Sequence, residues 1–207
     1  MGLRYDIFMI QTPADTLHTR LMGTGVCTDR SDLLRQNRDW DLAWEQTLNA
    51  AWQKNAPEEV LAALHAEPDD PVLQEYRHPP SFQYRVWWMA APDDPEVSIG
   101  MFTSPRLQIA PAQIALLALM HRAGIKEVLL VEYSSISGGG TAFRWQRAPQ
   151  HTTKIPMLLE EECQFERYAA RLDRKTGYPV SFWHQYVQNP KTRIPWSHEV
   201  LVTPAPS

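Results

Sequence analysis

The residues of this chain that are best suited to chemistry are the cations and aromatic side chains that follow three consecutive glycines, Gly138, Gly139 and Gly140. Between residues 141 and 154 the sequence contains no acidic residue. Basic side chains pair with phosphates and aromatic faces stack on bases, so this composition is typical of a segment that binds nucleic acid. The side chains that would make these contacts are Phe143, Arg144, Trp145, Arg147, His151 and Lys154.

A second group of cations, Arg171 and Arg174, lies near the end of a helix that we predict over residues 157–176. Glutamates at the start of this segment and arginines at its end both suit the helix dipole. These cations would extend the surface of the glycine-rich hairpin. In the alternative interpretation the aromatic residues face the core and Arg144 faces solvent, because alternating apolar and charged residues are typical of any half-buried strand.

Two known catalytic motifs are partly matched by this sequence, and neither is complete. His65-Ala66-Glu67 has the first part of a zinc deaminase motif, but the pair of cysteines that would complete it does not follow. His151 begins a His-x-Thr sequence of the kind used by two-histidine phosphoesterases, whereas His18 has its threonine one place too early to be the second half. The histidines and cysteines show no metal-ligand spacing, so we expect no metal and no cofactor.

An enzyme remains an alternative with its catalytic residues unknown. It would be a small hydrolase or transferase whose pocket lies near the strand ends and uses residues such as His121, Glu132 or His151. The sequence does not show whether these side chains converge. We therefore favour a non-catalytic protein.

Three tryptophans, Trp40, Trp44 and Trp52, lie on one stripe of a predicted helix, with Leu48 between the last two. Spacings of four residues bring side chains to the same face of a helix. Tryptophans in such a stripe are more often core anchors than ligand contacts, because each can bury a large apolar area. If the stripe is exposed, it predicts a face that binds a protein partner.

The core that must position these residues is centred on residues 111–133. Pro111 suits the first turn of a helix that is apolar on most of its surface, and Gly124 suits the left-handed residue that ends it. The apolar run from Val128 to Val131 then predicts a strand that is covered on both faces. This helix and this strand form the predicted buried unit.

The remaining pattern predicts an α+β fold. Strands are expected near Tyr5, Phe82, Val97, Val128 and Thr141, and together they would form a mixed or antiparallel sheet. Residues 82–89 and 97–102 are expected to pair as a hairpin, and a closing strand is expected over residues 200–202. We predict one domain over residues 1–207, with an acidic helical insertion at about 31–77.

Charge and composition limit the partners. Residues 1–103 carry 8 Lys and Arg against 16 Asp and Glu, whereas residues 104–207 carry 12 against 8, so the two halves have opposite net charge. No apolar run approaches the roughly 20 residues that a membrane span requires. The two cysteines, Cys27 and Cys163, are too few for a disulfide framework, which favours a cytoplasmic setting.

The function predicted from these features is that of a non-catalytic accessory protein. It would bind nucleic acid, or join a nucleoprotein assembly, through the glycine-rich hairpin. The acidic N-terminal helices would then face solvent or a protein partner. The alternative to this function is an adaptor that binds another protein through the tryptophan stripe.

Overall fold

The computed structural model describes residues 4–79, 81–82, 84–91, 94–104, 109–134, 140–146, 163–164 and 196–203. For residues 4–6, 109–111, 131–134, 140–146 and 163–164 it describes the backbone alone. The chain divides into two compact units, of which one contains residues 30–81 and the other contains residues 1–29 and 82–207. We call them the helical unit and the sheet unit.

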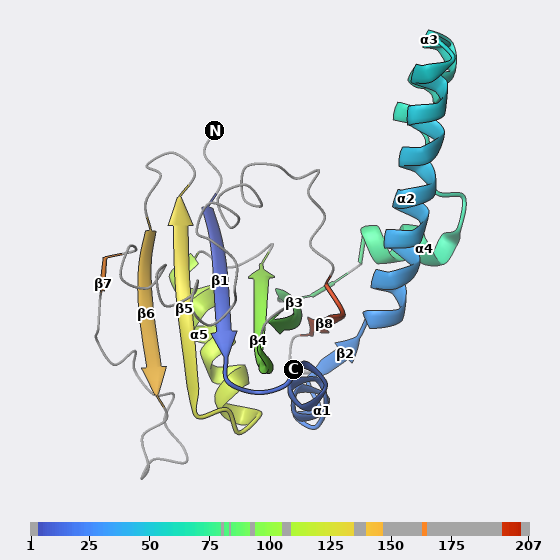
Figure 1. The fold of residues 1–207 in the computed structure, drawn as a ribbon. Helices are drawn as coiled ribbons and strands as arrows, with labels where there is room; N and C mark the ends of the chain where they lie inside the picture. The colour runs from blue at the N-terminus through green and yellow to red at the C-terminus, as the bar shows by residue number, and fades with distance from the viewer. Residues whose placement is uncertain are drawn as a thin grey trace. The chain divides into compact units, whose positions relative to one another are not determined.

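The described strands of the sheet unit form one eight-stranded sheet in the order β2-β8-β3-β4-β1-β5-β6-β7 (Figure 1). Every pairing between neighbours in this order is antiparallel. The strands are β1 Arg4–Ile10, β2 Cys27–Asp29, β3 Tyr84–Ala91, β4 Asp94–Thr103, β5 Glu127–Ser134, β6 Gly140–Gln146, β7 Cys163–Gln164 and β8 His198–Val202.

The described helices belong to both units. The sheet unit contains α1 (Ala14–Met22) and α5 (Ile109–Arg122), and the helical unit contains α2 (Ser31–Gln53), α3 (Pro57–Leu64) and α4 (Pro71–Arg77). The predicted α+β fold is therefore confirmed. No helix in the described part of the chain is both long enough and apolar enough to cross a membrane.

The predicted helix-strand unit is present as α5 and β5, although α5 begins two residues before Pro111. Gly124 has a positive φ of 76° and ends the helix as expected. The N–H of Gly124 donates to the carbonyl oxygen of His121, and that of Ile125 donates to Met120 at 2.9 Å. This pair of hydrogen bonds is the Schellman motif, which satisfies the last carbonyl groups of a helix and fixes the direction in which the chain leaves it.

Both faces of the central sheet are buried. Alternate residues of the strands form one cluster with the apolar side chains of α1 and α5, and Phe8, Trp88 and Leu130 are at its centre. The residues between them, including Ile99 and Leu129, are also buried but lie outside this cluster. Residues next to each other in a strand point to opposite faces of a sheet, which explains why Leu129 and Leu130 contribute to different layers.

The structure differs from the sequence prediction at two short elements. β2 was not predicted. The closing strand expected over residues 200–202 is present as β8, which lies between β2 and β3. A helix was predicted over residues 157–176, but the two positions described there, Cys163 and Gln164, form a strand that pairs with β6. At these two positions, backbone pairing with β6 determines the conformation although the local sequence favours a helix. Intrinsic helix propensity is weak, and tertiary contacts commonly override it.

Gly100 gives a direct test of the packing between β1, β3 and β4. A Cβ atom at this position would lie 2.1 Å from Phe8 Cζ and 2.4 Å from the carbonyl oxygen of Trp87. We expect Gly100→Ala to lower the free energy of unfolding by about 3 kcal/mol, because a packed core does not accommodate an added methyl group. Urea denaturation followed by circular dichroism measures this change.

Gly23→Ala is the matched control, since a Cβ atom there would contact its nearest neighbours at 3.4 Å. We expect the stability of this variant to remain within about 0.5 kcal/mol of the parent protein. Equal stabilities for the two variants would contradict the packing of Phe8 against Gly100.

Candidate functional site

Two histidines that are far apart in the sequence meet in the sheet unit. His18 lies on α1, whose buried residues Leu17 and Leu21 pack this helix against the sheet. His198 is the first residue of β8, and its backbone pairs with that of Trp88 in β3. The ring centroids of the two histidines are 5.1 Å apart. The sheet and the helix packed on it therefore bring together side chains separated by most of the chain.

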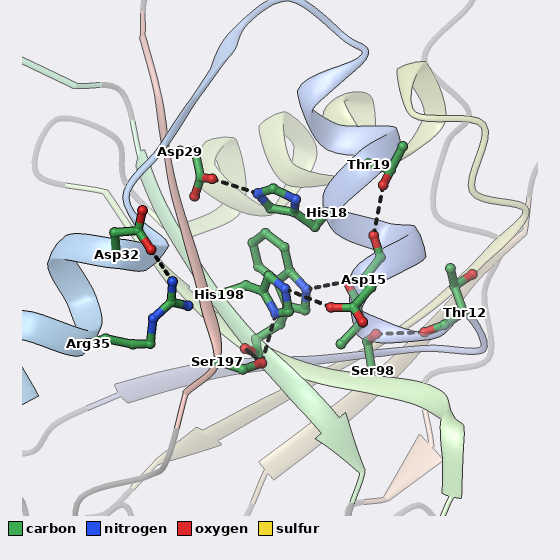
Figure 2. A network of polar contacts seen from close by, with 12 residues as sticks. Thr12, Asp15, His18, Thr19, Asp29, Asp32, Arg35, Ser98, Ser197 and His198 are labelled. Carbon is green, nitrogen blue, oxygen red and sulfur yellow. Dashed lines mark hydrogen bonds and ion pairs between the residues drawn. The ribbon is translucent and has the colours of Figure 1, made fainter.

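Each histidine has a carboxylate beside it (Figure 2). His198 Nε2 lies 3.1 Å from Asp15 Oδ1, and His18 Nε2 lies 3.0 Å from Asp29 Oδ2. The second contact is at ion-pair distance, but His18 Nε2 makes no well-aligned hydrogen bond. Asp15 is almost fully exposed, whereas the side chain of His198 is only 15% exposed. The histidine pair thus has the exposed carboxylate of Asp15 on one side and the protein interior on the other.

The histidine pair lies against the indole of Trp88, which is fully buried. The ring of His198 is stacked on it with centroids 5.2 Å apart and an interplanar angle of 8°. Trp88 Nε1 donates a hydrogen bond of 3.0 Å to the carbonyl oxygen of Ala14, in the first turn of α1. Trp88 therefore holds the helix that carries His18 and also supports the ring of His198.

Burial lowers the pKa of His198 below its usual value, and the nearby charge of His18 acts in the same direction. Asp15 and Asp29 oppose this shift. His198 is consequently neutral at neutral pH. The neutral tautomer that suits its surroundings has hydrogen on Nε2, which faces Asp15, and leaves Nδ1 to accept from the hydroxyl of Ser197 at 2.8 Å.

The neutral imidazole of His198 is able to accept a proton. Ser197, His198 and Asp15 have the residue types of a nucleophile activated by a base. However, the Ser197 hydroxyl also lies 3.3 Å from the carbonyl oxygen of Trp88, and its backbone N–H donates to the same oxygen. These contacts attach Ser197 to β3, so its hydroxyl has a structural role.

No metal site is evident among the described residues, where no group of three or more histidine, cysteine or acidic side chains is placed to hold an ion. The thiol of Cys27 packs against the main core, and burial raises its pKa, while a hydrogen bond with Thr24 and the charge of Arg122 oppose this shift. A raised pKa keeps the thiol protonated and unreactive. Cys27 is therefore a packing residue.

A buried ion pair lies beside the histidine site, on the other face of the sheet. Glu199 is fully buried, and its Oε1 accepts hydrogen bonds from Arg85 Nε at 3.1 Å and from Arg85 Nη2 at 2.7 Å. Its second oxygen accepts from Trp87 Nε1 at 2.8 Å. No sequence pattern indicates this pair, because Arg85 and Glu199 are 114 residues apart.

The hairpin predicted to bind nucleic acid is described only in its backbone. β5 and β6 pair from Tyr133 with Gly140 to Glu127 with Gln146, so Gly140 is the first residue of β6, whereas Gly138 and Gly139 lie outside the described part of the chain. Arg144 is opposite Leu129, and Trp145 is opposite Val128. The other predicted contact residues lie outside the described part of the chain, namely Arg147, His151, Lys154, Arg171 and Arg174.

The predicted tryptophan stripe lies on α2 and is divided in two. Trp40 and Trp44 are half-buried, with stacked rings 6.5 Å apart. Arg77 of α4 lies 4.4 Å over the ring of Trp40, and Trp44 Nε1 donates a hydrogen bond to the carbonyl oxygen of Ala63 in α3. Trp52 is 62% exposed. The first two tryptophans hold the three helices together, and the third faces solvent.

Exposed apolar side chains are concentrated in the helical unit. Of the six large apolar side chains that are exposed in the described ranges, five belong to this unit. Leu61 and Leu64 are three residues apart on α3 and therefore lie on the same side of it. The five residues are Leu42, Trp52, Leu61, Leu64 and Val72.

The helical unit is also acidic. Residues 30–81 contain 5 Lys and Arg against 10 Asp and Glu, and between residues 42 and 72 Lys54 is the only Lys or Arg, against six acidic residues. Most of these acidic side chains are exposed. The exposed surface of the helical unit therefore carries both apolar and negatively charged side chains.

Sequence reasoning did not find the histidine pair. Of the three residues considered for an enzyme pocket, only His121 has a described side chain, and it lies in the last turn of α5. His18 was considered only with a motif at His151, whereas its partner is His198. The pairing of β8 with β3 creates this contact, and no local sequence pattern indicates a pairing over such a distance.

Comparisons with protein families, with curated proteins and with solved structures found no match for this chain. The geometry of the described residues is therefore the basis of the proposals that follow.

The buried ion pair gives a test of this region. We expect Arg85→Met to lower the free energy of unfolding by about 3 kcal/mol, because it removes the cation beside a buried carboxylate. Adding Glu199→Gln to this variant should restore part of the loss, since a neutral amide is less costly to bury than a carboxylate. Urea denaturation of the two single variants and the double variant measures the coupling.

Arg35→Met is the matched control, because Arg35 pairs with Asp32 on the surface, where their side chains are 50% and 81% exposed. Surface pairs of this kind contribute little, and we expect a change below about 0.5 kcal/mol. An equal loss of stability for Arg35→Met and Arg85→Met would contradict a specific contribution of the buried pair.

Proposed function

We propose that this chain is a non-catalytic binding protein whose helical unit docks onto a basic, amphipathic segment of a protein partner. The observation that supports this proposal most directly is the exposure of Trp52, Leu61 and Leu64 on a unit with a net negative charge. Concentrated exposed apolar side chains with a polar surround are typical of protein-binding surfaces. Aromatic anchors such as an exposed tryptophan contribute a large share of the binding energy in many interfaces.

The acidic residues around these side chains favour one kind of occupant. Glu58, Glu59 and Glu67 are exposed on or beside α3, and they would attract a partner that carries lysines and arginines. A second copy of the same unit would bring like charges together, which opposes self-association. A basic helix with one apolar face satisfies both the charge and the exposed apolar area.

Trp40 and Trp44 have a supporting role in this proposal. Their contacts with Arg77 and with the backbone of α3 fix the spacing of the helices. The helices in turn present Trp52 and Leu61 to solvent. The proposed binding surface therefore includes only the exposed end of the predicted tryptophan stripe, Trp52, and continues onto α3 with Leu61. The two cysteines of the chain favour a reducing cytoplasm as the setting.

A second candidate function is binding of nucleic acid through the β5–β6 hairpin. It is supported by the antiparallel pairing of β5 with β6, which begins at Gly140, and by the absence of acidic residues between positions 141 and 154. The side chains that would contact phosphates remain a prediction from the sequence.

The protein-binding proposal is tested with two synthetic helical peptides that have the same leucine face and either lysines or glutamates on the other face. Fluorescence anisotropy should show binding of the lysine peptide alone, with an affinity that falls as salt increases. Trp52→Ser together with Leu61→Ser should weaken binding about tenfold or more, which corresponds to about 1.4 kcal/mol. Unfolding in urea should remain unchanged, because both side chains are exposed.

Ile114→Ser is the matched control, since Ile114 is 48% exposed but lies in the sheet unit. It should leave the affinity for the lysine peptide unchanged. Equal binding of the two peptides, or an equal loss of affinity in the control, would refute the proposal. Concentration-dependent dimerisation that is reduced by Trp52→Ser would instead indicate a second copy as the occupant.

The nucleic-acid candidate is tested by titrating single- and double-stranded oligonucleotides at several salt concentrations. If Arg144 and Arg147 contact phosphates, replacing both with alanine should reduce the slope of log affinity against log salt by about 2. Lys54→Ala, in the acidic helical unit, should leave the slope unchanged. Binding that does not depend on salt, or no binding, would remove this candidate.

A further inference from the structure

The contacts of His18 and His198 join three elements that are separate in the sequence. His18 and Asp15 belong to α1, Asp29 is the last residue of β2, and His198 begins β8. β2 is only three residues long and lies at the edge of the sheet, where β8 is its neighbour. A short edge strand has few backbone hydrogen bonds, so its position depends on side-chain contacts such as that between His18 and Asp29.

We propose that His18 and His198 form a proton-operated latch, which holds α1, β2 and β8 together while the ring of His198 is neutral and loosens them when that ring is protonated. This device is independent of the protein-binding surface proposed for the helical unit.

The geometry explains why protonation of His198 is unfavourable. The centroids of the two rings are 5.1 Å apart, so a positive charge on His198 would lie close to any positive charge on His18. His198 is mostly buried against Trp88, and the interior gives its charged form little solvent. A charge that is buried without full compensation favours the open state, in which water can solvate it.

The charged groups that face His198 come from two elements. Asp15 and His18 lie on α1, and Asp29 lies on β2, while Trp88 of β3 brings no charge. The carboxylates attract a protonated ring and oppose the effect of burial and of His18. Asp15 is 97% exposed, so solvent screens its attraction. Burial and repulsion therefore outweigh the two carboxylates, which agrees with the lowered pKa of His198.

The direction of the pH effect on stability follows from the lowered pKa of His198. Because the pKa of His198 is lower in the folded state than in an open state, the open state binds protons more readily. Its contribution to stability is complete above the ordinary histidine pKa of about 6.5 and is lost as the pH falls below that value. The latch is thus closed at neutral pH and opens in mild acid.

Hydrogen–deuterium exchange of the full chain, read by mass spectrometry at about pH 7.5 and about pH 5.5 and corrected for intrinsic rates, tests this proposal. Exchange in α1, β2 and β8 should increase at least about tenfold more in acid than exchange in α5, which serves as the internal reference. His198→Gln, which cannot gain a proton, should abolish this difference. His65→Gln is the matched control on the helical unit, where His65 is exposed, and it should leave the difference unchanged.

A second measurement does not depend on the folding of His198→Gln. The imidazole of His198 is titrated by NMR in variants that keep it. His18→Gln should move its pKa upward, because a neighbouring positive charge is lost, and Asp15→Asn should move it downward, because an attracting carboxylate is lost. A purely structural role for these residues would not produce shifts in opposite directions.

Three results would overturn the proposal. One is titration of His198 at or above the ordinary pKa of histidine. Another is an acid-induced increase in exchange that is as large in α5 as in α1, β2 and β8, which would indicate general unfolding. The third is an increase confined to these elements that persists in His198→Gln.

Discussion

The contact that most of the sheet unit depends on is the burial of the Trp88 indole between the sheet and α1. Trp88 is fully buried, and its backbone pairs with Gly100 on one side and with His198 on the other. Gly100 has no side chain, and the ring of Phe8 occupies the space where one would be. A large residue beside a glycine thus lets two aromatic rings share one layer of the core, and the Nε1 bond to Ala14 fixes the helix above them.

Burial of both faces of the sheet explains why its polar groups are paired. Ser98 is fully buried, and its hydroxyl donates to the carbonyl oxygen of Thr12 at 2.6 Å. Glu199 accepts from Arg85 and Trp87 on the opposite face from His198, which is the next residue toward the N-terminus of the chain. Two consecutive residues of β8 therefore place a buried carboxylate in one layer and a titrating imidazole in the other. Polar groups with so little solvent require partners to be stable, and this requirement fixes the register of β8 against β3.

The features that could be predicted from the sequence are those that are specified by residues close together in the chain. The apolar run of β5 and the glycine at position 124 specify a helix, its end and the following strand without reference to other parts of the chain. Strand β1 and the β3–β4 hairpin were recognisable for the same reason. The exposure of Trp52, in contrast to the partial burial of Trp40, could not be predicted from the four-residue spacing, which is the same kind of signal for all three tryptophans.

The remaining features depend on pairings between distant segments. β2 has three residues, which is too short for a periodic pattern, and it forms because β8 offers it an edge. The position of β8 in the sheet order then determines that His198, rather than any nearer histidine, meets His18. A histidine in a helix and one at the start of a strand have no spacing that would reveal this contact. Motif analysis therefore did not find the candidate site, although two of the strands that form it, β3 and β8, had been expected.

The two proposed properties depend on different interactions, which makes them separable in one protein. Binding of a basic partner depends on exposed side chains such as Glu58, Glu59 and Trp52, whereas the latch depends on protonation of the mostly buried imidazole of His198. Because the acidic surface and the histidine pair belong to different compact units, each can be changed by substitution without removing the residues on which the other depends.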